Sequence, residues 1–225
     1  EMCIRDRAVM KKLKFVFLMS FTQLLAENSS VPVINALSSR YHPTQILADL
    51  LTLLEIEAGP DGALPKLSTL AGRKVAWVGD SNNILNDMLV TYPRLGINLS
   101  VAAPPGQAYA KDPVVWEQME QDLASLPKRL PKGTVEWSHV PTQAVRDTDY
   151  IVTDTWCAMF FHTDSRISMG DEASKEQRLK DFDGFQVTEE LGRTGGAKPH
   201  WKFLHCLPRK AEEVDDEVRV FMYLY

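Results

Sequence analysis

The sequence Val75–Asp80, VAWVGD, contains four consecutive apolar residues of strand length that end in a Gly-Asp turn. A helical pattern of apolar residues follows from about Asn83 to Tyr92. Continuous apolar runs of this length are typical of strands that are buried on both faces of a parallel sheet. This part of the chain is therefore predicted to be a strand followed by a crossover helix.

The same alternation continues on both sides of this unit. Further strands are predicted at Leu99–Ala103, Val135–Trp137, Tyr150–Thr153 and Lys202–His205, and helices at 45–57, 112–126, 141–146 and 171–182. Strands that alternate with helices of this length form a parallel sheet with helices on both faces. The predicted fold class is α/β, a Rossmann-like doubly wound parallel sheet.

Glycines are the second source of information on the fold. No G-x-G-x-x-G follows the strand at Val75–Val78, so a nucleotide site would lack its phosphate-binding turn. Gly192, Gly195 and Gly196 follow no strand pattern, and we expect them to lie in a flexible loop.

Composition limits the possible functions. The net charge is -5 in 225 residues, with a pI near 5.6, which argues against a nucleic-acid surface because phosphate backbones need clustered cations. Three widely spaced cysteines, Cys3, Cys157 and Cys206, form no CxxC pair, so we expect a reduced compartment, no structural metal and no metal site. The apolar run Leu13–Met19 is too short to span a bilayer and is followed by no cleavage pattern, so we expect neither membrane insertion nor secretion.

Polar side chains follow several of the predicted strands. The apolar run at Phe203 stops at Cys206 and Pro208, and Asp154 follows Tyr150–Thr153. Ligands of open α/β sheets bind at the carboxyl ends of the strands, so these residues are candidates for a site. For a lone cysteine the commoner alternative is packing, and for Asp154 it is a helix cap.

His42 and Gln45 stand three residues apart at the start of a predicted helix and so project from one face of it. A histidine there can donate to a developing oxyanion, and the exposed N–H groups of a helix start favour an anion. The alternative is a capping histidine beside a surface glutamine.

Four segments together resemble the ornithine carbamoyltransferases: HPTQ at 42–45, GDSNN at 79–83, SMG at 168–170 and HCLP at 205–208. The resemblance implies transfer of a carbamoyl group from carbamoyl phosphate to the δ-amine of L-ornithine, giving L-citrulline and phosphate in arginine biosynthesis, with no cofactor. Those two small molecules are the expected substrates.

The resemblance also implies roles for individual residues. His42 and Gln45 would contact the carbamoyl group, and Cys206 and Leu207 would line the position of the reacting amine. His42, Asp154 and Cys206 are then the expected catalytic residues. The expected ornithine-binding residues are Asn83, Asp154, Ser168, Met169, Cys206 and Leu207.

The resemblance divides the chain unevenly. Residues 1–24 are expected to be unmatched, 25–66 to be the end of a carbamoyl phosphate domain with the inter-domain helix, 67–218 to be the ornithine-binding domain, and 219–225 to be an unmatched tail. Residues 157–166 are an insert relative to the family, for which an error in the gene model is the preferred explanation. The family's phosphate-binding Ser-x-Arg-Thr is absent from this sequence, so we expect a fragment that is inactive by itself.

Alternatives stay open on sequence grounds. The chain could be a non-catalytic binding or regulatory module with this fold, or another carbamoyltransferase, although aspartate carbamoyltransferases usually carry proline where Cys206 stands. A similarity to fungal members implies the mitochondrial matrix, with the cytoplasm as the alternative. The parent protein is expected to form a homotrimer, whereas this fragment is not expected to form one.

Overall fold

The computed structural model describes residues 21–58, 62–156 and 172–218. Its centre is a sheet of five parallel strands in the order β3-β2-β1-β4-β5. The strands are β1 (Lys74–Val78), β2 (Asn98–Ala102), β3 (Val135–Ser138), β4 (Tyr150–Thr153) and β5 (Lys202–His205). All five predicted strands are confirmed, and so is the α/β fold class.

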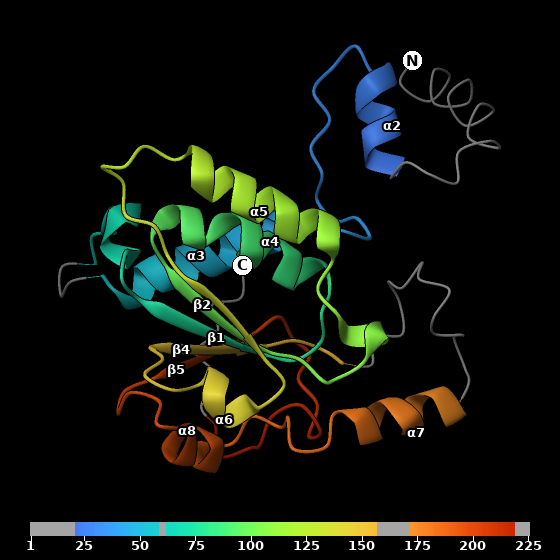
Figure 1. Ribbon diagram of the computed structural model, residues 1–225, viewed down its shortest axis with the longest axis vertical. Helices are drawn as coiled ribbons and strands as arrows, with labels where there is room; N and C mark the ends of the chain where they lie inside the picture. The colour runs from blue at the N-terminus through green and yellow to red at the C-terminus, as the bar shows by residue number, and fades with distance from the viewer. Residues whose placement is uncertain (1–20, 59–61, 157–171, 219–225) are drawn as a thin grey trace.

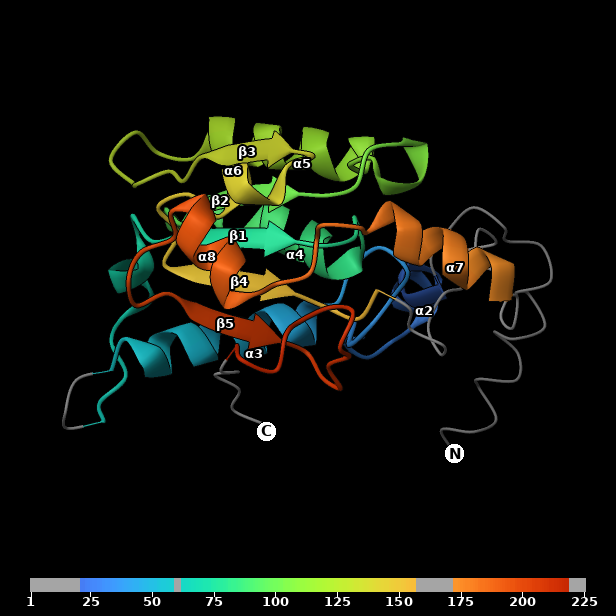
Figure 2. The ribbon, with the colours of Figure 1, turned by 90° about the horizontal axis from the view of Figure 1, so that it is seen from below.

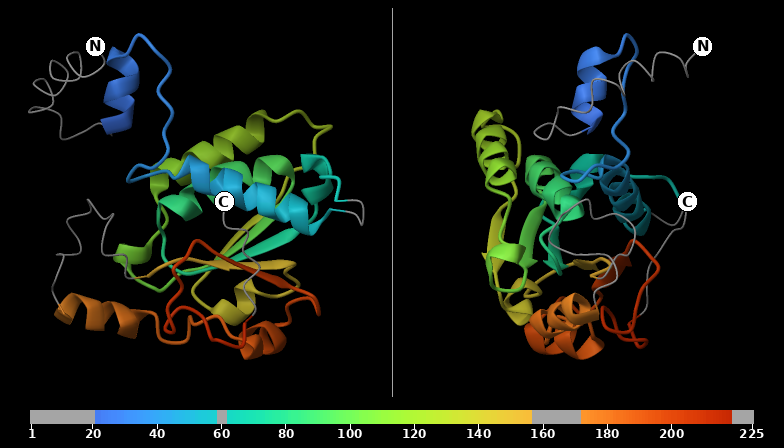
Figure 3. Two further views of the ribbon diagram at one scale, coloured as in Figure 1. Left: turned by 180° about the vertical axis from the view of Figure 1, so that it is seen from behind. Right: turned by 90° about the vertical axis from the view of Figure 1, so that its right-hand side faces the viewer.

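Helices cover both faces of the sheet, as Figures 1 and 2 show. One face carries α3 (Pro43–Ile56), α4 (Asn83–Thr91) and α5 (Pro113–Ser125). The other face carries α6 (Pro141–Ala144) and α8 (Glu189–Gly195), with α7 (Glu172–Asp181) beside them. Short 3-10 helices lie at Leu67–Leu70, Pro93–Leu95 and Gln107–Tyr109, and α2 (Phe21–Asn28) stands apart from the layers (Figure 3).

Alternating side chains along β1 explain the two-sided burial. Val75 and Trp77 pack into the apolar cluster beneath α3 and α4, whereas Ala76 and Val78 pack into the cluster beneath α6 and α8. All four side chains are completely buried. A strand with period-two geometry and two covered faces needs apolar residues at every position, as this stretch has.

The prediction of a loop at Gly192, Gly195 and Gly196 is wrong for the first two, whereas Gly196 lies in the turn that follows the helix. The first two lie in α8, which begins at the cap Thr188 and ends at Gly196 with φ +78°. A Cβ on Gly192 would come within 2.7 Å of the Trp201 ring, and one on Gly195 within 2.2 Å of Val145 Cγ2. These glycines permit close packing of the helix, a tertiary requirement that local sequence pattern does not reveal.

The strand order reverses between β1 and β4. After β1 the chain moves outward through β2 and β3, and then returns to place β4 on the other side of β1. In doubly wound sheets, this reversal leaves a crevice at the carboxyl ends of the two strands, where ligands bind. Here those ends lead to Gly79-Asp80 and to Asp154.

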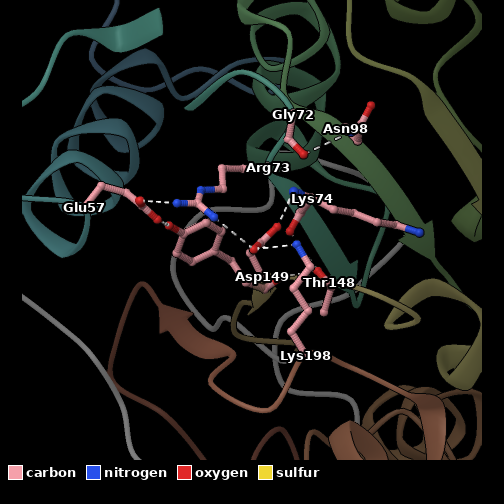
Figure 4. Close-up of polar contacts among 9 residues, drawn as sticks. Glu57, Gly72, Arg73, Lys74, Asn98, Thr148, Asp149 and Lys198 are labelled. Carbon is pink, nitrogen blue, oxygen red and sulfur yellow. Dashed lines mark hydrogen bonds and ion pairs between the residues drawn. The ribbon is translucent and has the colours of Figure 1, made fainter. Parts of the chain in front are cut away.

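At the opposite, amino-terminal ends of the strands, the sheet is held by a group of charged contacts centred on Asp149 (Figure 4). The Asp149 carboxylate accepts from the Lys74 backbone N–H at 2.8 Å and pairs with Lys198 Nζ at 2.7 Å and Arg73 Nη1 at 3.5 Å. Arg73 also pairs with Glu57, just beyond α3. These contacts join the starts of β1 and β4 to the end of α3.

We expect Asp149→Ala to lower the free energy of unfolding by about 2–3 kcal/mol, because it removes the acceptor of a partly buried backbone donor and the carboxylate that pairs with Lys198 and Arg73. Urea unfolding measures this value. The control is Glu136→Ala, which removes a carboxylate whose side chain is 66% exposed and which pairs with Lys74 at 3.3 Å. That change should alter stability by less than about 0.5 kcal/mol, and equal losses in the two variants would contradict the structural role of Asp149.

Candidate active site

Asp154 lies at the carboxyl end of β4 and is 5% exposed. Its Oδ2 accepts a hydrogen bond from Asn82 Nδ2, whereas its buried Oδ1 has no hydrogen-bond partner among the described residues. Burial raises the pKa of Asp154 well above its usual value, and the nearby Asp80 carboxylate adds to the effect. One side of this carboxyl is fixed, and the other is available to a ligand.

Asn82 performs two functions at the start of α4. Its side-chain oxygen accepts from the backbone N–H groups of Ile84 at 3.0 Å and Leu85 at 3.2 Å, which caps the helix. Its amide nitrogen donates to Asp154. The helix cap therefore also fixes the orientation of the buried carboxyl.

A small cavity lies beside Asp154. Residues from α3, α4, β1, β4 and β5 line it: Gln45, Asp49, Trp77, Ile84, Val152, Thr153, Asp154, His205 and Cys206. Its volume is about 10 Å³, which is room for roughly one water molecule. The ornithine expected from the sequence is larger than this cavity.

Cys206 reaches this cavity from the end of β5. Burial raises the pKa of its thiol to about 12, and the Asp154 carboxyl contributes to the rise. The thiol is therefore neutral at physiological pH. It presents a polarisable, uncharged surface rather than a thiolate nucleophile.

His205 and Glu213 fix the loop that carries Cys206. His205 Nδ1 accepts from the Leu207 backbone N–H at 2.9 Å, so its Nε2 carries the proton and donates to Glu213 Oε2 at 3.2 Å. Glu213 Oε1 accepts from the Trp156 backbone N–H at 3.0 Å. The ends of β4 and β5 are thereby joined through one buried carboxylate.

Asp80 is held by a separate ion pair. Its carboxylate pairs with Arg178 of α7, and the Arg178 Nε donates to the Trp156 backbone carbonyl. Trp77 Nε1 donates to the Asp80 backbone carbonyl at 2.9 Å. These contacts connect α7 to the ends of β1 and β4.

His42 precedes α3 at its N-cap position and is half-buried. Its Nδ1 lies 3.1 Å from Thr44 Oγ1, and that hydroxyl donates to the Ala36 carbonyl at 2.8 Å, so Nδ1 acts as the donor to Thr44. Burial lowers the pKa of His42, although hydrogen bonds with backbone groups oppose this effect. The imidazole is therefore favoured in its neutral form.

The polar side of α4 holds the segment that leads to His42. Asn83 Nδ2 donates to the Ser38 carbonyl at 2.9 Å, and Asn86 Nδ2 donates to the Arg40 carbonyl at 3.0 Å. Asp87 accepts the backbone N–H of His42. Three side chains spaced three and four residues apart on α4 thus fix the start of α3.

The structure brings some of the predicted site residues together and separates others. Gln45, Asp154 and Cys206 line one cavity, whereas Asn83 faces the Ser38 segment. Two further predicted residues do not line this cavity: His42 and Leu207. Ser168, Met169 and the insert at 157–166 lie outside the described residues.

Sequence reasoning missed Asp49 and did not assign Asn82 to the site. Asp49 lies four residues after Gln45, one helical turn further on, and this spacing was the available signal. Its side chain is 7% exposed and accepts from Gln45 Nε2 at 2.9 Å. Asn82 carried only the signal of a helix cap, since its contact with Asp154 spans 72 residues of sequence.

Within residues 21–58, 62–156 and 172–218, no group of three or more His, Cys, Asp and Glu side chains is arranged to hold a metal ion. No helix in those same ranges is both long and apolar enough to cross a membrane.

Comparison with known proteins gives the class of this fold and site. The family model for the aspartate/ornithine carbamoyltransferase Asp/Orn-binding domain matches residues 71–220, and the model for the family's carbamoyl-P-binding domain matches residues 5–55. The chain belongs to the aspartate/ornithine carbamoyltransferase family. The second match begins before residue 25, where the predicted domain starts, and the division into domains stays a prediction.

The similar proteins are ornithine carbamoyltransferases. The mitochondrial enzyme of Emericella nidulans is 45% identical over 194 residues, which are 86% of this chain and 50% of that protein. The crystal structure of a mitochondrial ornithine carbamoyltransferase from Coccidioides immitis has a TM-score of 0.69 at 41% identity and covers 86% of this chain and 53% of that one. The ornithine carbamoyltransferase from Pyrococcus furiosus has a TM-score of 0.69 at 38% identity, with 88% and 54% covered. The chain spans about half the length of these relatives.

Asp49 provides a test of the site's electrostatics. Burial raises its pKa from 3.8 to about 7, although the Gln45 hydrogen bond opposes the rise. A folded pKa above the unfolded one means that the contribution of Asp49 is fully present below about pH 4 and is lost as the pH rises through about 7. Asp49→Asn should remove this loss, so that at pH 8 the variant is more stable than the wild type by about 2–4 kcal/mol.

Urea unfolding of both proteins at pH 4 and pH 8 measures this effect. Asp183→Asn changes an exposed carboxylate and is the control. Its stability difference from the wild type should vary by less than about 0.5 kcal/mol between the two conditions. A pH-independent difference for Asp49→Asn would contradict the raised pKa.

Proposed function

We propose that the complete protein containing this chain is an ornithine carbamoyltransferase. In this reaction the δ-nitrogen of L-ornithine attacks the carbonyl carbon of carbamoyl phosphate. The new C–N bond forms, the C–O bond to phosphate breaks, and phosphate leaves with the bonding electron pair. The amine loses one proton, and the products are L-citrulline and phosphate.

The observation that carries this proposal is the unpartnered oxygen of Asp154 beside Cys206. A buried carboxyl with one free oxygen is a strong partner for an amine or ammonium group, because such a polar atom is costly to leave unsatisfied. The adjacent thiol stays neutral, so it adds no competing charge. The pair supports binding of an amine nucleophile at the end of β4 and β5.

The carbamoyl side is supported by the start of α3. Gln45 lines the same cavity as Asp154 and Cys206, and His42 lies three residues before it at the helix start. Unpaired N–H groups at a helix N-terminus stabilise negative charge. We assign Gln45 and His42 to the carbamoyl group, with His42 stabilising the carbonyl oxygen as charge develops. Because the neutral imidazole already donates through Nδ1 to Thr44, this role requires that Nε2 carry a proton when the substrate is bound.

The remaining assignments depend on the family. Asn83, Ser168, Met169 and Leu207 are proposed to complete the ornithine site. In the described state one N–H of Asn83 Nδ2 donates to the Ser38 carbonyl, and the proposed role toward ornithine uses the remaining N–H or the side-chain oxygen. No cofactor is needed for the balanced reaction above.

We also propose a location and an assembly for the complete protein. The fungal relatives are named as mitochondrial enzymes, which supports the mitochondrial matrix over the cytoplasm. A homotrimer is proposed for the complete protein from its family, and the 225-residue chain is proposed not to form it. Small molecules, rather than nucleic acid or membrane, are the proposed partners.

The first test is activity. We expect the complete protein to form citrulline from carbamoyl phosphate and ornithine, and His42→Ala to lower kcat by about a hundredfold or more, since it removes a donor to the developing oxyanion. The 225-residue chain alone should form none, because the family's phosphate-binding Ser-x-Arg-Thr is absent from it. A colorimetric assay of citrulline measures all three samples.

Ser125→Ala is the control for the activity test, because Ser125 ends α5 and donates only to the Asp122 carbonyl in the described contacts. It should leave citrulline formation unchanged. A complete protein with no activity would overturn the proposed function. Activity of the 225-residue chain that His42→Ala abolishes would show that the absent segments are dispensable.

A second test separates the two substrates. Cys206→Ala should lower kcat/KM for ornithine by about tenfold while changing the KM for carbamoyl phosphate by less than about twofold, because the thiol lines the amine side of the site. Steady-state kinetics with each substrate varied in turn give both values. Equal losses for the two substrates would argue against this assignment of Cys206.

A further inference from the structure

Gln45 and Asp49 form a side-chain pair on one face of α3. Gln45 Nε2 donates to Asp49 Oδ1 at 2.9 Å, and the two residues are one helical turn apart. Both line the cavity that also contains Asp154 and Cys206. The pair therefore contributes to the same site as the proposed amine-binding groups.

The chemistry of the pair fixes which end of the Gln45 amide faces the cavity. An ionised carboxylate only accepts hydrogen bonds, whereas a glutamine amide has a donating NH₂ end and an accepting carbonyl end. Gln45 must therefore turn its NH₂ group toward Asp49. Its carbonyl Oε1 is then the end that is available to an N–H donor.

We propose that Asp49 is a positioning residue that fixes the orientation of Gln45, so that Gln45 Oε1 accepts a hydrogen bond from the NH₂ group of carbamoyl phosphate. This inference rests on the proposed function. It explains why Gln45 accepts from the substrate and does not donate to it. If the Gln45 amide were rotated, its NH₂ group would face the NH₂ group of carbamoyl phosphate and the hydrogen bond would be lost. Asp49 itself acts through Gln45 and not on the substrate.

A purely structural role explains the carboxyl poorly. The buried face of α3 otherwise consists of Ile46, Leu50 and Leu53, with Thr52 satisfied by the Ala48 carbonyl of its own helix at 3.0 Å. A buried carboxyl on this face is less stabilising than an aliphatic side chain of similar size. The carboxyl of Asp49 is explained better by its acceptor character, which it uses toward Gln45.

The pair must be considered with the titratable groups around it. Asp154, His205 and Cys206 face the cavity from the ends of β4 and β5, and the buried Tyr92 follows α4 and interacts electrostatically with Asp49. Burial raises the pKa of Asp49 to about 7. Alkaline conditions, which also favour the neutral substrate amine, therefore keep Asp49 ionised and Gln45 in the proposed orientation.

Kinetics of the complete protein at about pH 8.5, where Asp49 is ionised, test the inference. Asp49→Leu should lower kcat/KM for carbamoyl phosphate by about tenfold or more, with less than about a twofold change in the KM for ornithine. Asp49→Asn should show a smaller loss of about threefold, because its carbonyl can accept from Gln45 in one of its two orientations. Thr52→Val changes a buried polar group on the same helix outside the cavity and should leave both constants unchanged.

A double-mutant cycle shows whether Asp49 acts through Gln45. In a Gln45→Ala background, Asp49→Leu should cause no further loss of kcat/KM for carbamoyl phosphate. A full additional loss in that background overturns the inference, and so does wild-type activity in either Asp49 variant. Thermal unfolding verifies folding, and Asp49→Asn decides the result if Asp49→Leu does not fold. A wild-type protein that forms no citrulline overturns the proposed function and this inference together.

Discussion

Burial of several carboxyl groups at the carboxyl ends of the strands is the constraint on which the rest of the site depends. The reversal of strand order between β1 and β4 places the ends of these strands side by side, and β5 adds a third end. Asp80, Asp154 and Glu213 are all buried there. Buried carboxylates are costly unless each is paired or hydrogen-bonded. The contacts of this edge are best understood as the compensation that these groups require.

The three buried carboxyl groups are not equally well satisfied, and the least satisfied of them marks the candidate site. Asp80 has the Arg178 ion pair, and Glu213 accepts from His205 and from backbone N–H groups. Asp154 is held by Asn82 on one oxygen, while its other oxygen has no hydrogen bond within the described ranges. Asp154 lines the cavity at the ends of β4 and β5, and a polar ligand that binds the unsatisfied oxygen gains most there.

The order of residues at the start of α4 links the two sides of this site. Asn82 caps the helix and holds Asp154, and the next residue, Asn83, holds the Ser38 segment that leads to His42. One turn later, Asp87 binds the backbone of His42. A displacement of α4 would therefore move Asp154 and His42 together, and with them the proposed amine and carbamoyl sides of the site. The start of one helix therefore positions side chains that are far apart in the sequence.

The sequence predicted those features that depend on local pattern. Continuous apolar runs such as Val75–Val78 identify buried strands, and the spacing of Ile46, Leu50 and Leu53 identifies α3, because these periodicities follow directly from backbone geometry. Features that depend on tertiary contact were missed. The glycines of α8 are explained by the approach of Trp201 and Val145, and the second function of Asn82 depends on Asp154.

The electrostatic state of the site is compatible with the amine nucleophile of the proposed reaction. An ammonium beside a carboxylate and a neutral amine beside a carboxylic acid differ only in the position of one proton, and only the neutral amine can attack a carbonyl carbon. Burial raises the pKa of Asp154 and so favours the uncharged pair over the ion pair. The neutral thiol of Cys206 maintains the same low-charge environment. In the proposed reaction, the burial that makes Asp154 costly to fold is thus also what makes its partner amine reactive.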